Sequence, residues 1–97
     1  MAQASYWPQL AACFARLGMP VAVVDLETTG GNMYEDRVTE VALLRFEGGK
    51  ITQHQWLVNP EQPISPFITR LTGIDNEMVA AAPTFAELAP TLLPLLR

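Results

Sequence analysis

Asp25 and Glu27 are the residues whose types and spacing point most directly to chemistry. They close an apolar run, VAVVDLE at residues 21–27, and a single residue separates them. Side chains on a strand alternate between faces, so both carboxylates point to one side, with their Cα atoms about 7 Å apart. Such a pair is stable when protons or cations neutralise it, and hard divalent cations prefer oxygen ligands. Two such ions could activate a water and stabilise the leaving oxygen of a phosphodiester. Taken alone, the pair is better interpreted as two exposed carboxylates at a strand-to-loop junction than as a metal site. The neighbouring segments must therefore decide between the two interpretations.

Three apolar segments predict the strands that must position this pair. Residues 21–27 are apolar on both faces in their first half, which is typical of a central buried strand. Residues 38–46 and 51–58 predict two further strands, and the glycines within 47–50 favour a hairpin turn between them. The first half of the chain is therefore expected to form a three-stranded antiparallel meander.

A helix is predicted before the strands. Apolar residues recur at helical spacing within residues 6–17, and a glycine follows them. We interpret residues 1–18 as an accessory N-terminal helix and residues 19–97 as part of the functional domain.

Helices are also predicted after the strands. A short helix is expected at residues 67–71, beyond a proline-rich loop. Thr84 and Glu87 match a capping box at the start of a last helix. Pro90 and Pro94 lie inside that helix and predict a kinked or irregular course, because each removes a backbone donor.

Composition and charge restrict the binding surface. The chain has 97 residues, with 6 basic and 10 acidic side chains and a net charge of −4. The basic residues are scattered, whereas a nucleic-acid surface normally gathers them, so metal ions or another segment must help to neutralise phosphates. We expect a soluble cytoplasmic protein without a membrane partner, because no apolar run is long enough to cross a bilayer. Cys13 is the single cysteine and is interpreted as a small buried hydrophobe.

Five ordered segments share their residue types with one known family. They are VAVVDLETTG at 21–30, RVTEVA at 37–42, NP at 59–60, ITRLTGI at 68–74 and PTF at 83–85. Together they resemble the DnaQ-like (DEDD) group of 3′–5′ exonucleases, over nearly the whole chain. The resemblance implies an α/β fold, the N-terminal part of an RNase H-like mixed sheet.

The resemblance implies a metal site at Asp25 and Glu27. These residues match the two family carboxylates that bind catalytic metals, so two divalent ions, Mg²⁺ or Mn²⁺, are the expected cofactors. The implied reaction is hydrolysis of terminal phosphodiesters at a nucleic acid 3′ end. DNA is expected in preference to RNA, although proofreading, repair and RNA trimming share this motif.

The resemblance also implies two segments that contact the terminal nucleotide. Thr28 and Thr29 match residues whose backbone and hydroxyl groups do so, and turn amides at a strand end can donate to a phosphate or a 3′-hydroxyl. Leu71, Thr72 and Gly73 match a segment beside the terminal base and sugar. An apolar Leu71 suits any base. The alternative, a core leucine on the short helix, is equally supported.

Two other polar residues lie on predicted strands. Glu40 is expected to anchor a nearby loop or to face solvent, with a direct catalytic role as the lesser alternative. His54 is interpreted as a surface residue of the third strand, because the histidine of the family belongs to a later motif.

Two later motifs of the family have no counterpart in the sequence. No acidic residue or histidine follows Glu87. We therefore expect a truncated domain, inactive alone, whose later parallel strands are missing. The strand at 21–27 should then have an exposed edge that favours self-association. Two alternative functions stay open, namely an inactive exonuclease-like binding or scaffold module, and the exonuclease domain of a multi-domain repair nuclease.

Overall fold

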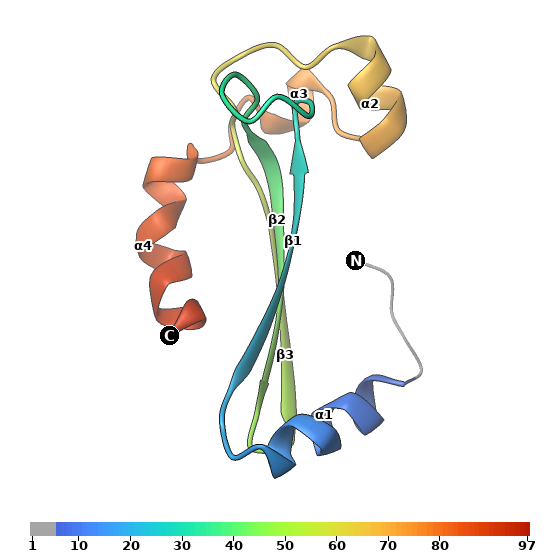
Figure 1. Cartoon of the computed structure of the whole chain (residues 1–97). Coiled ribbons are helices and arrows are strands. Elements are labelled where there is room, and N and C mark those ends of the chain that lie inside the picture. Colours follow the sequence, from blue (N-terminus) through green and yellow to red (C-terminus); the bar gives the residue numbers. More distant parts are fainter. Residues whose placement is uncertain (1–5) are drawn as a thin grey trace. The chain divides into compact units, whose positions relative to one another are not determined.

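The computed structural model describes residues 6–97, and these form an α/β structure. In chain order its elements are α1 (Trp7–Arg16), β1 (Val21–Thr28), β2 (Val38–Glu47), β3 (Lys50–Leu57), α2 (Pro66–Thr72), α3 (Asn76–Val79) and α4 (Phe85–Leu96) (Figure 1). The predicted strands and helices are confirmed to within a few residues. The first five residues of the predicted accessory helix lie outside the described part of the chain.

The three strands form one sheet in the order β1-β2-β3. This arrangement confirms the predicted antiparallel meander. Gly48 and Gly49 make the turn between β2 and β3 with φ angles of 57° and 80°, a backbone region that glycine enters at little cost. A short turn of this kind makes β2 and β3 neighbours in the sheet.

The central strand is β2, and β1 lies at the edge of the sheet. Val23, Val24 and Leu26 of β1 are 42%, 45% and 48% exposed, so the prediction of a central buried strand is wrong for β1. A strand with apolar residues on both faces is buried only where neighbours cover it, and the described sheet pairs β1 on one side alone. The expectation of an exposed edge at this strand is confirmed.

The described chain divides into two compact units. Unit 1 comprises the residues up to Asp25 together with Ala42–His54, and unit 2 comprises Leu26–Val41 with Gln55–Arg97. Each unit has its own hydrophobic core.

The core of unit 1 is formed by α1 and the strands that it covers. Ala11 packs with Leu44 and Phe46, and the rings of Phe14 and Phe46 meet edge to face with centroids 5.0 Å apart. Cys13 is exposed, so the prediction of a buried thiol is wrong. The buried side of α1 carries Ala11, and a residue two positions further along a helix points to the opposite side.

Unit 2 contains two hydrophobic clusters. The first joins α4 to the sheet through Val41, Val58, Leu88 and Leu92, and the second gathers Ile64, Ile74 and Val79. These clusters hold α3 and α4 against the strand ends.

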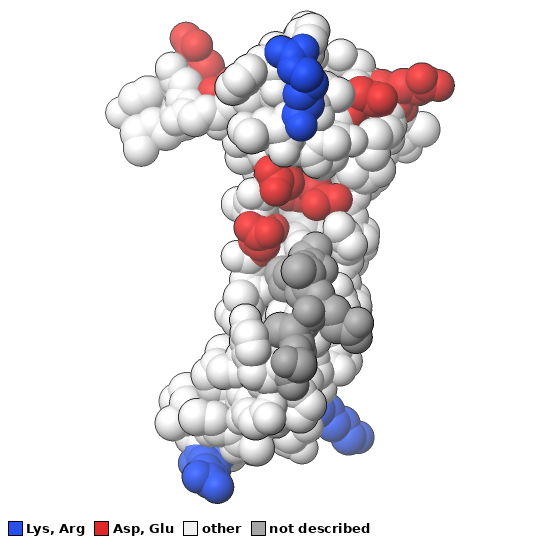
Figure 2. Space-filling model, turned by 90° about the vertical axis from the view of Figure 1, so that its right-hand side faces the viewer, with Lys and Arg blue, Asp and Glu red and all other residues white. Residues whose placement is uncertain are grey.

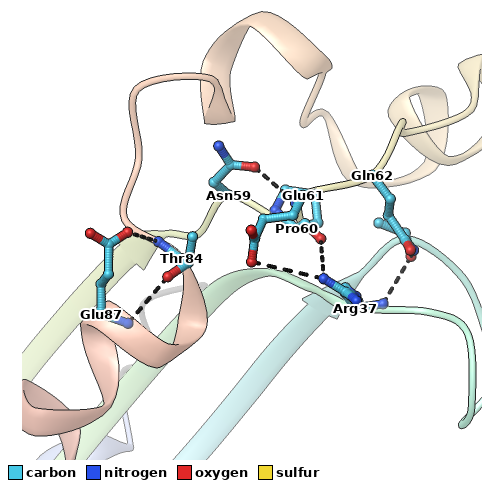
Figure 3. Close-up of polar contacts among 8 residues, drawn as sticks. Arg37, Asn59, Pro60, Glu61, Gln62, Thr84 and Glu87 are labelled. Atoms are coloured by element: carbon cyan, nitrogen blue, oxygen red, sulfur yellow. Dashed lines mark hydrogen bonds and ion pairs between the residues drawn. The ribbon is translucent and has the colours of Figure 1, made fainter.

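The start of α4 confirms the predicted capping box. The Thr84 hydroxyl accepts from the Glu87 amide at 3.2 Å, and the Glu87 carboxylate accepts from the Thr84 amide at 3.0 Å (Figure 3). Although Pro90 and Pro94 lie inside α4, the helix runs unbroken to Leu96. The described residues include no helix that is both long and apolar enough to cross a membrane.

Candidate active site

The predicted metal ligands Asp25 and Glu27 lie on β1 with one residue between them. Asp25 is exposed and Glu27 is half-buried, so water or an ion can reach both carboxylates. Their alternate positions on the strand direct them to the same side. Carboxylate oxygens are the ligands that Mg²⁺ and Mn²⁺ prefer, so the chemistry of this pair fits the implied metal.

The pair supplies only part of a complete ligand set. Over residues 6–97 no group of three or more His, Cys, Asp or Glu side chains is placed to hold an ion. Mg²⁺ takes six oxygen ligands and usually keeps several waters, with substrate phosphates completing its shell. Two carboxylates therefore suit an ion that is shared with a bound phosphodiester.

Thr28 and Thr29 follow the carboxylates, and their hydroxyl groups have different surroundings. The Thr28 hydroxyl donates to the Gly30 carbonyl at 2.6 Å and is half-buried. Thr29 is 8% exposed, and its hydroxyl donates to Asp36 Oδ1 at 2.9 Å. Its backbone amide donates to the Arg37 carbonyl at 2.8 Å. Thr29 thus joins the end of β1 to the start of β2.

Asp36 holds the loop between β1 and β2. In addition to Thr29, it accepts from the Asn32 amide at 2.7 Å through Oδ2, and its own amide donates to the Asn32 carbonyl at 2.9 Å. Gly30 packs against this carboxylate, because a Cβ at residue 30 would lie 2.6 Å from Asp36 Oδ2. Space, and not a positive φ, therefore requires a glycine at residue 30.

The loop after β3 reaches the same threonine. Gln62 Nε2 donates to the Thr29 hydroxyl at 2.8 Å. Arg37 donates to the Pro60 carbonyl at 3.4 Å and pairs with Glu61 at 3.8 Å (Figure 3). Sequence analysis missed Asp36 and Gln62. The acidic Asp36 shortly after T-T-G was a usable signal, whereas nothing in the proline-rich loop marked Gln62.

The third predicted segment, Leu71 to Gly73, ends α2. Leu71 is 72% exposed, so the alternative of a core leucine is wrong. The Thr72 hydroxyl donates to the Ile68 carbonyl at 2.9 Å, and Gly73 closes the helix with a φ of 79°. An exposed leucine beside a glycine turn leaves an apolar surface open to a ligand.

The two remaining candidates on the strands have structural surroundings. Glu40 accepts from Gln55 Nε2 at 3.1 Å, across β2 and β3. His54 lies on β3, as predicted, and is half-buried. Neither is grouped with other potential metal ligands among the described residues.

Basic side chains are too few to form a phosphate-binding surface by themselves. Two of the six, Arg37 and Arg45, lie near carboxylates, at 3.8 Å from Glu61 and 3.3 Å from Glu47 respectively. Figure 2 shows several acidic side chains close together on one face of the molecule. An acidic strand end with so few basic neighbours repels a phosphate unless cations neutralise it.

The chain is similar to known nucleases in sequence and in structure. The exonuclease family model RNase_T matches residues 22–97. The DNA polymerase III subunit epsilon of Aquifex aeolicus is 42% identical over 72 residues, which cover 73% of this chain and 36% of that protein. A Mycobacterium tuberculosis protein whose name describes a bifunctional exonuclease/endonuclease is 43% identical over 75 residues, 70% of this chain and 12% of that protein.

A solved structure shows the same likeness. Exonuclease X in complex with 5′ overhanging duplex DNA matches with a TM-score of 0.63 and 30% identity, over 73% of this chain and 42% of that chain. The fold and the family match thus define an RNase H-like exonuclease domain. The chain belongs to the exonuclease family, which confirms the predicted resemblance. It spans 36% or less of the length of the two relatives above.

Proposed function

We propose that the protein is a 3′–5′ exonuclease that removes nucleotides from DNA ends with two divalent ions, Mg²⁺ or Mn²⁺. The observation that carries this proposal is the pair Asp25 and Glu27 at the end of β1, directly before a loop that many hydrogen bonds hold, in a chain of the exonuclease family. Both carboxylates serve as metal ligands in this proposal.

The carboxylates have one task, which is to hold positive charge against the scissile phosphate. When bound, the ions would provide a nucleophilic water at neutral pH and positive charge that stabilises the leaving oxygen. Asp25 is exposed, so both of its carboxylate oxygens are accessible to an ion. Glu27 is half-buried, so an ion has less access to its carboxylate. The scarcity of free basic residues makes the reaction depend strongly on the ions.

Contacts to the terminal nucleotide come from two segments. The exposed side chain of Leu71 offers an apolar surface that accepts any base, with Thr72 and Gly73 beside the sugar. At the end of β1, Thr28 keeps acceptor capacity on its hydroxyl for this contact, whereas Thr29, in the same predicted segment, bonds within the protein. A surface that reads no base edge suits an enzyme that degrades any sequence.

DNA is the proposed substrate, and the cytoplasm the proposed setting. Exonuclease X, which shares 30% identity with this chain, was solved in complex with duplex DNA. The exposed free thiol of Cys13 suits a reducing compartment.

The decisive experiment is digestion of 3′-labelled and 5′-labelled single-stranded DNA by the full-length protein. Mg²⁺ or Mn²⁺ should support stepwise shortening from the 3′ end, chelation should stop it, and Asp25→Ala should abolish it. Activity that persists in Asp25→Ala refutes the assignment, and shortening from the 5′ end refutes the polarity.

A second candidate is a module that binds strand ends without cleaving them. It is favoured by the finding that the described residues bring only two carboxylates together on β1. Calorimetric titration with Mn²⁺ separates the candidates. The exonuclease binds Mn²⁺ through Asp25 and Glu27, and loses this binding in Asp25→Ala, whereas a module without catalytic metals shows no difference between the two proteins.

A third candidate is an exonuclease domain within a repair protein that carries a second nuclease. The Mycobacterium tuberculosis relative, with exonuclease and endonuclease in its name, favours it. Cleavage of circular DNA by the full-length protein, unaffected by Asp25→Ala, would support this candidate.

A further inference from the structure

The Thr29 hydroxyl uses its whole hydrogen-bonding capacity inside the protein. A hydroxyl has one donor and two acceptor sites. The donor is used by Asp36 Oδ1 at 2.9 Å, and the acceptor sites by the Arg37 amide at 3.0 Å and Gln62 Nε2 at 2.8 Å. With Thr29 only 8% exposed, its hydroxyl has no site left for a nucleotide.

The three partners of this hydroxyl come from two loops of unit 2. Asp36 belongs to the loop between β1 and β2, and also holds the Asn32 amide at 2.7 Å. Arg37 precedes β2, while Gln62 lies in the loop after β3, 33 residues from Thr29 in sequence. One buried oxygen therefore ties the end of β1 to two loops.

The neighbouring threonine is arranged differently. The Thr28 hydroxyl donates to Gly30 within its own turn and keeps both acceptor sites. Thr28 is also more exposed than Thr29. The two threonines therefore differ: Thr28 keeps acceptor sites open to a ligand, whereas the hydroxyl of Thr29 is used within the protein.

We propose that Asp36 and Gln62 are positioning residues of the exonuclease site, which act through the Thr29 hydroxyl to fix the strand end that carries Asp25 and Glu27. This inference rests on the proposed function and deepens it. It replaces the direct nucleotide contact predicted for the Thr29 hydroxyl. A displacement of about 1 Å in a catalytic group can cost on the order of 10²-fold in rate. The hydrogen bonds of the Thr29 hydroxyl should therefore affect turnover more than substrate affinity.

The kinetic test compares variants of the full-length enzyme on a short single-stranded DNA. Thr29→Val keeps the shape but removes all three bonds, and should lower kcat on the order of 10²-fold. Gln62→Ala removes one bond and should lower kcat roughly tenfold. KM should stay within about threefold of the wild-type value in both.

Two comparisons give the test its controls. Thr29→Ser restores the hydroxyl and should recover most of the lost kcat, whereas Thr52→Val, at an exposed threonine of β3, should change nothing. The double variant Thr29→Val/Gln62→Ala should be no worse than Thr29→Val, because Thr29→Val already removes the bond that Gln62→Ala removes. A raised KM with unchanged kcat in Thr29→Val overturns the proposal, and so does full additivity.

Hydrogen exchange keeps this test separate from that of the proposed function. Gln62→Ala should speed amide exchange at residues 29–37 and leave α4 protected, whether or not the protein is a nuclease. Wild-type protein without exonuclease activity refutes the proposed function alone. Unchanged exchange at residues 29–37 overturns the positioning role alone.

Discussion

The strands β1 and β2 are neighbours in one sheet but have opposite characters. β2 buries Val41, Ala42, Leu43 and Leu44 in succession, so both of its faces are covered. On β1, Val23 and Val24 are more than two-fifths exposed, and Asp25 follows them. Apolar burial stabilises by about 25 cal/mol per Å², so β2 carries stability that β1 does not. The proposed chemistry lies on the strand that contributes less to the core.

The largest expected effect tests the β1 side of this comparison. Asp25→Ala should lower exonuclease activity on the order of 10³-fold or more, because a metal ligand is lost. The thermal midpoint should hardly change, since Asp25 is exposed. Glu40→Ala on β2 is the matched control and should keep near-normal activity. Equal losses in the two variants would contradict the assignment of the site to β1.

The second prediction tests the contribution of β2 to the stability of the fold. Leu43 is 0% exposed, so Leu43→Ala should lower the free energy of unfolding by about 2–5 kcal/mol. Val24→Ala on β1 should lower it by less than about 1 kcal/mol. Urea unfolding measures both. Similar losses would show that β1 is covered in solution, for example by a second copy of the chain.

The connection between the two strands should give an intermediate effect. In Gly30→Ala the new Cβ would meet Asp36 Oδ2 at 2.6 Å, whereas nothing lies within 4 Å of a Cβ in Gly31→Ala. The first should cost about 1–3 kcal/mol through overpacking, and should lower activity with it. The second should stay within about 0.5 kcal/mol of wild type. Urea unfolding and turnover rates should show the larger loss in Gly30→Ala and almost none in Gly31→Ala.

Removal of the cap of α4 should affect the stability of the core around β2 and not the proposed active site on β1. Leu88 and Leu92 of α4 pack on Val41, so Thr84→Ala should lower stability by about 1 kcal/mol and leave kcat unchanged. Thermal unfolding and initial rates measure the two effects. A fall in kcat without a fall in stability would link α4 to the site directly.

The smallest effect concerns pH. The hydrogen bond from the Thr84 backbone amide, and then the one from its side chain, lower the pKa of Glu87 below its ordinary value of 4.5. A lowered folded-state pKa stabilises above the unfolded value, and this stabilisation is lost as the pH falls through the folded pKa. The thermal midpoint of wild type should therefore exceed that of Glu87→Gln at pH 7, with the difference vanishing below the folded pKa. A difference that persists in acid would contradict this origin.

Much of the local structure followed from the sequence. The apolar runs predicted the three strands, Gly48 and Gly49 predicted the hairpin turn, and Thr84 with Glu87 predicted the start of α4. These features depend on residues close together in the chain, where φ preference, side-chain alternation and capping act. The D-x-E-T-T-G motif belongs to the same class, because two alternate strand positions share a side whatever surrounds them.

Burial and long-range hydrogen bonds were decided by the tertiary structure. The apolar run of β1 reads as a central strand, yet its place at the sheet edge leaves it exposed. Cys13 and Leu71 are apolar by type, but both face away from the cores that their helices cover. Gln62 meets Thr29 across 33 residues of sequence, a contact that no local pattern encodes. The sequence by itself determined which residues could bind a metal, because residue type and strand spacing are local. Only the tertiary structure decided what holds those residues in place, because that depends on which distant segments pack together.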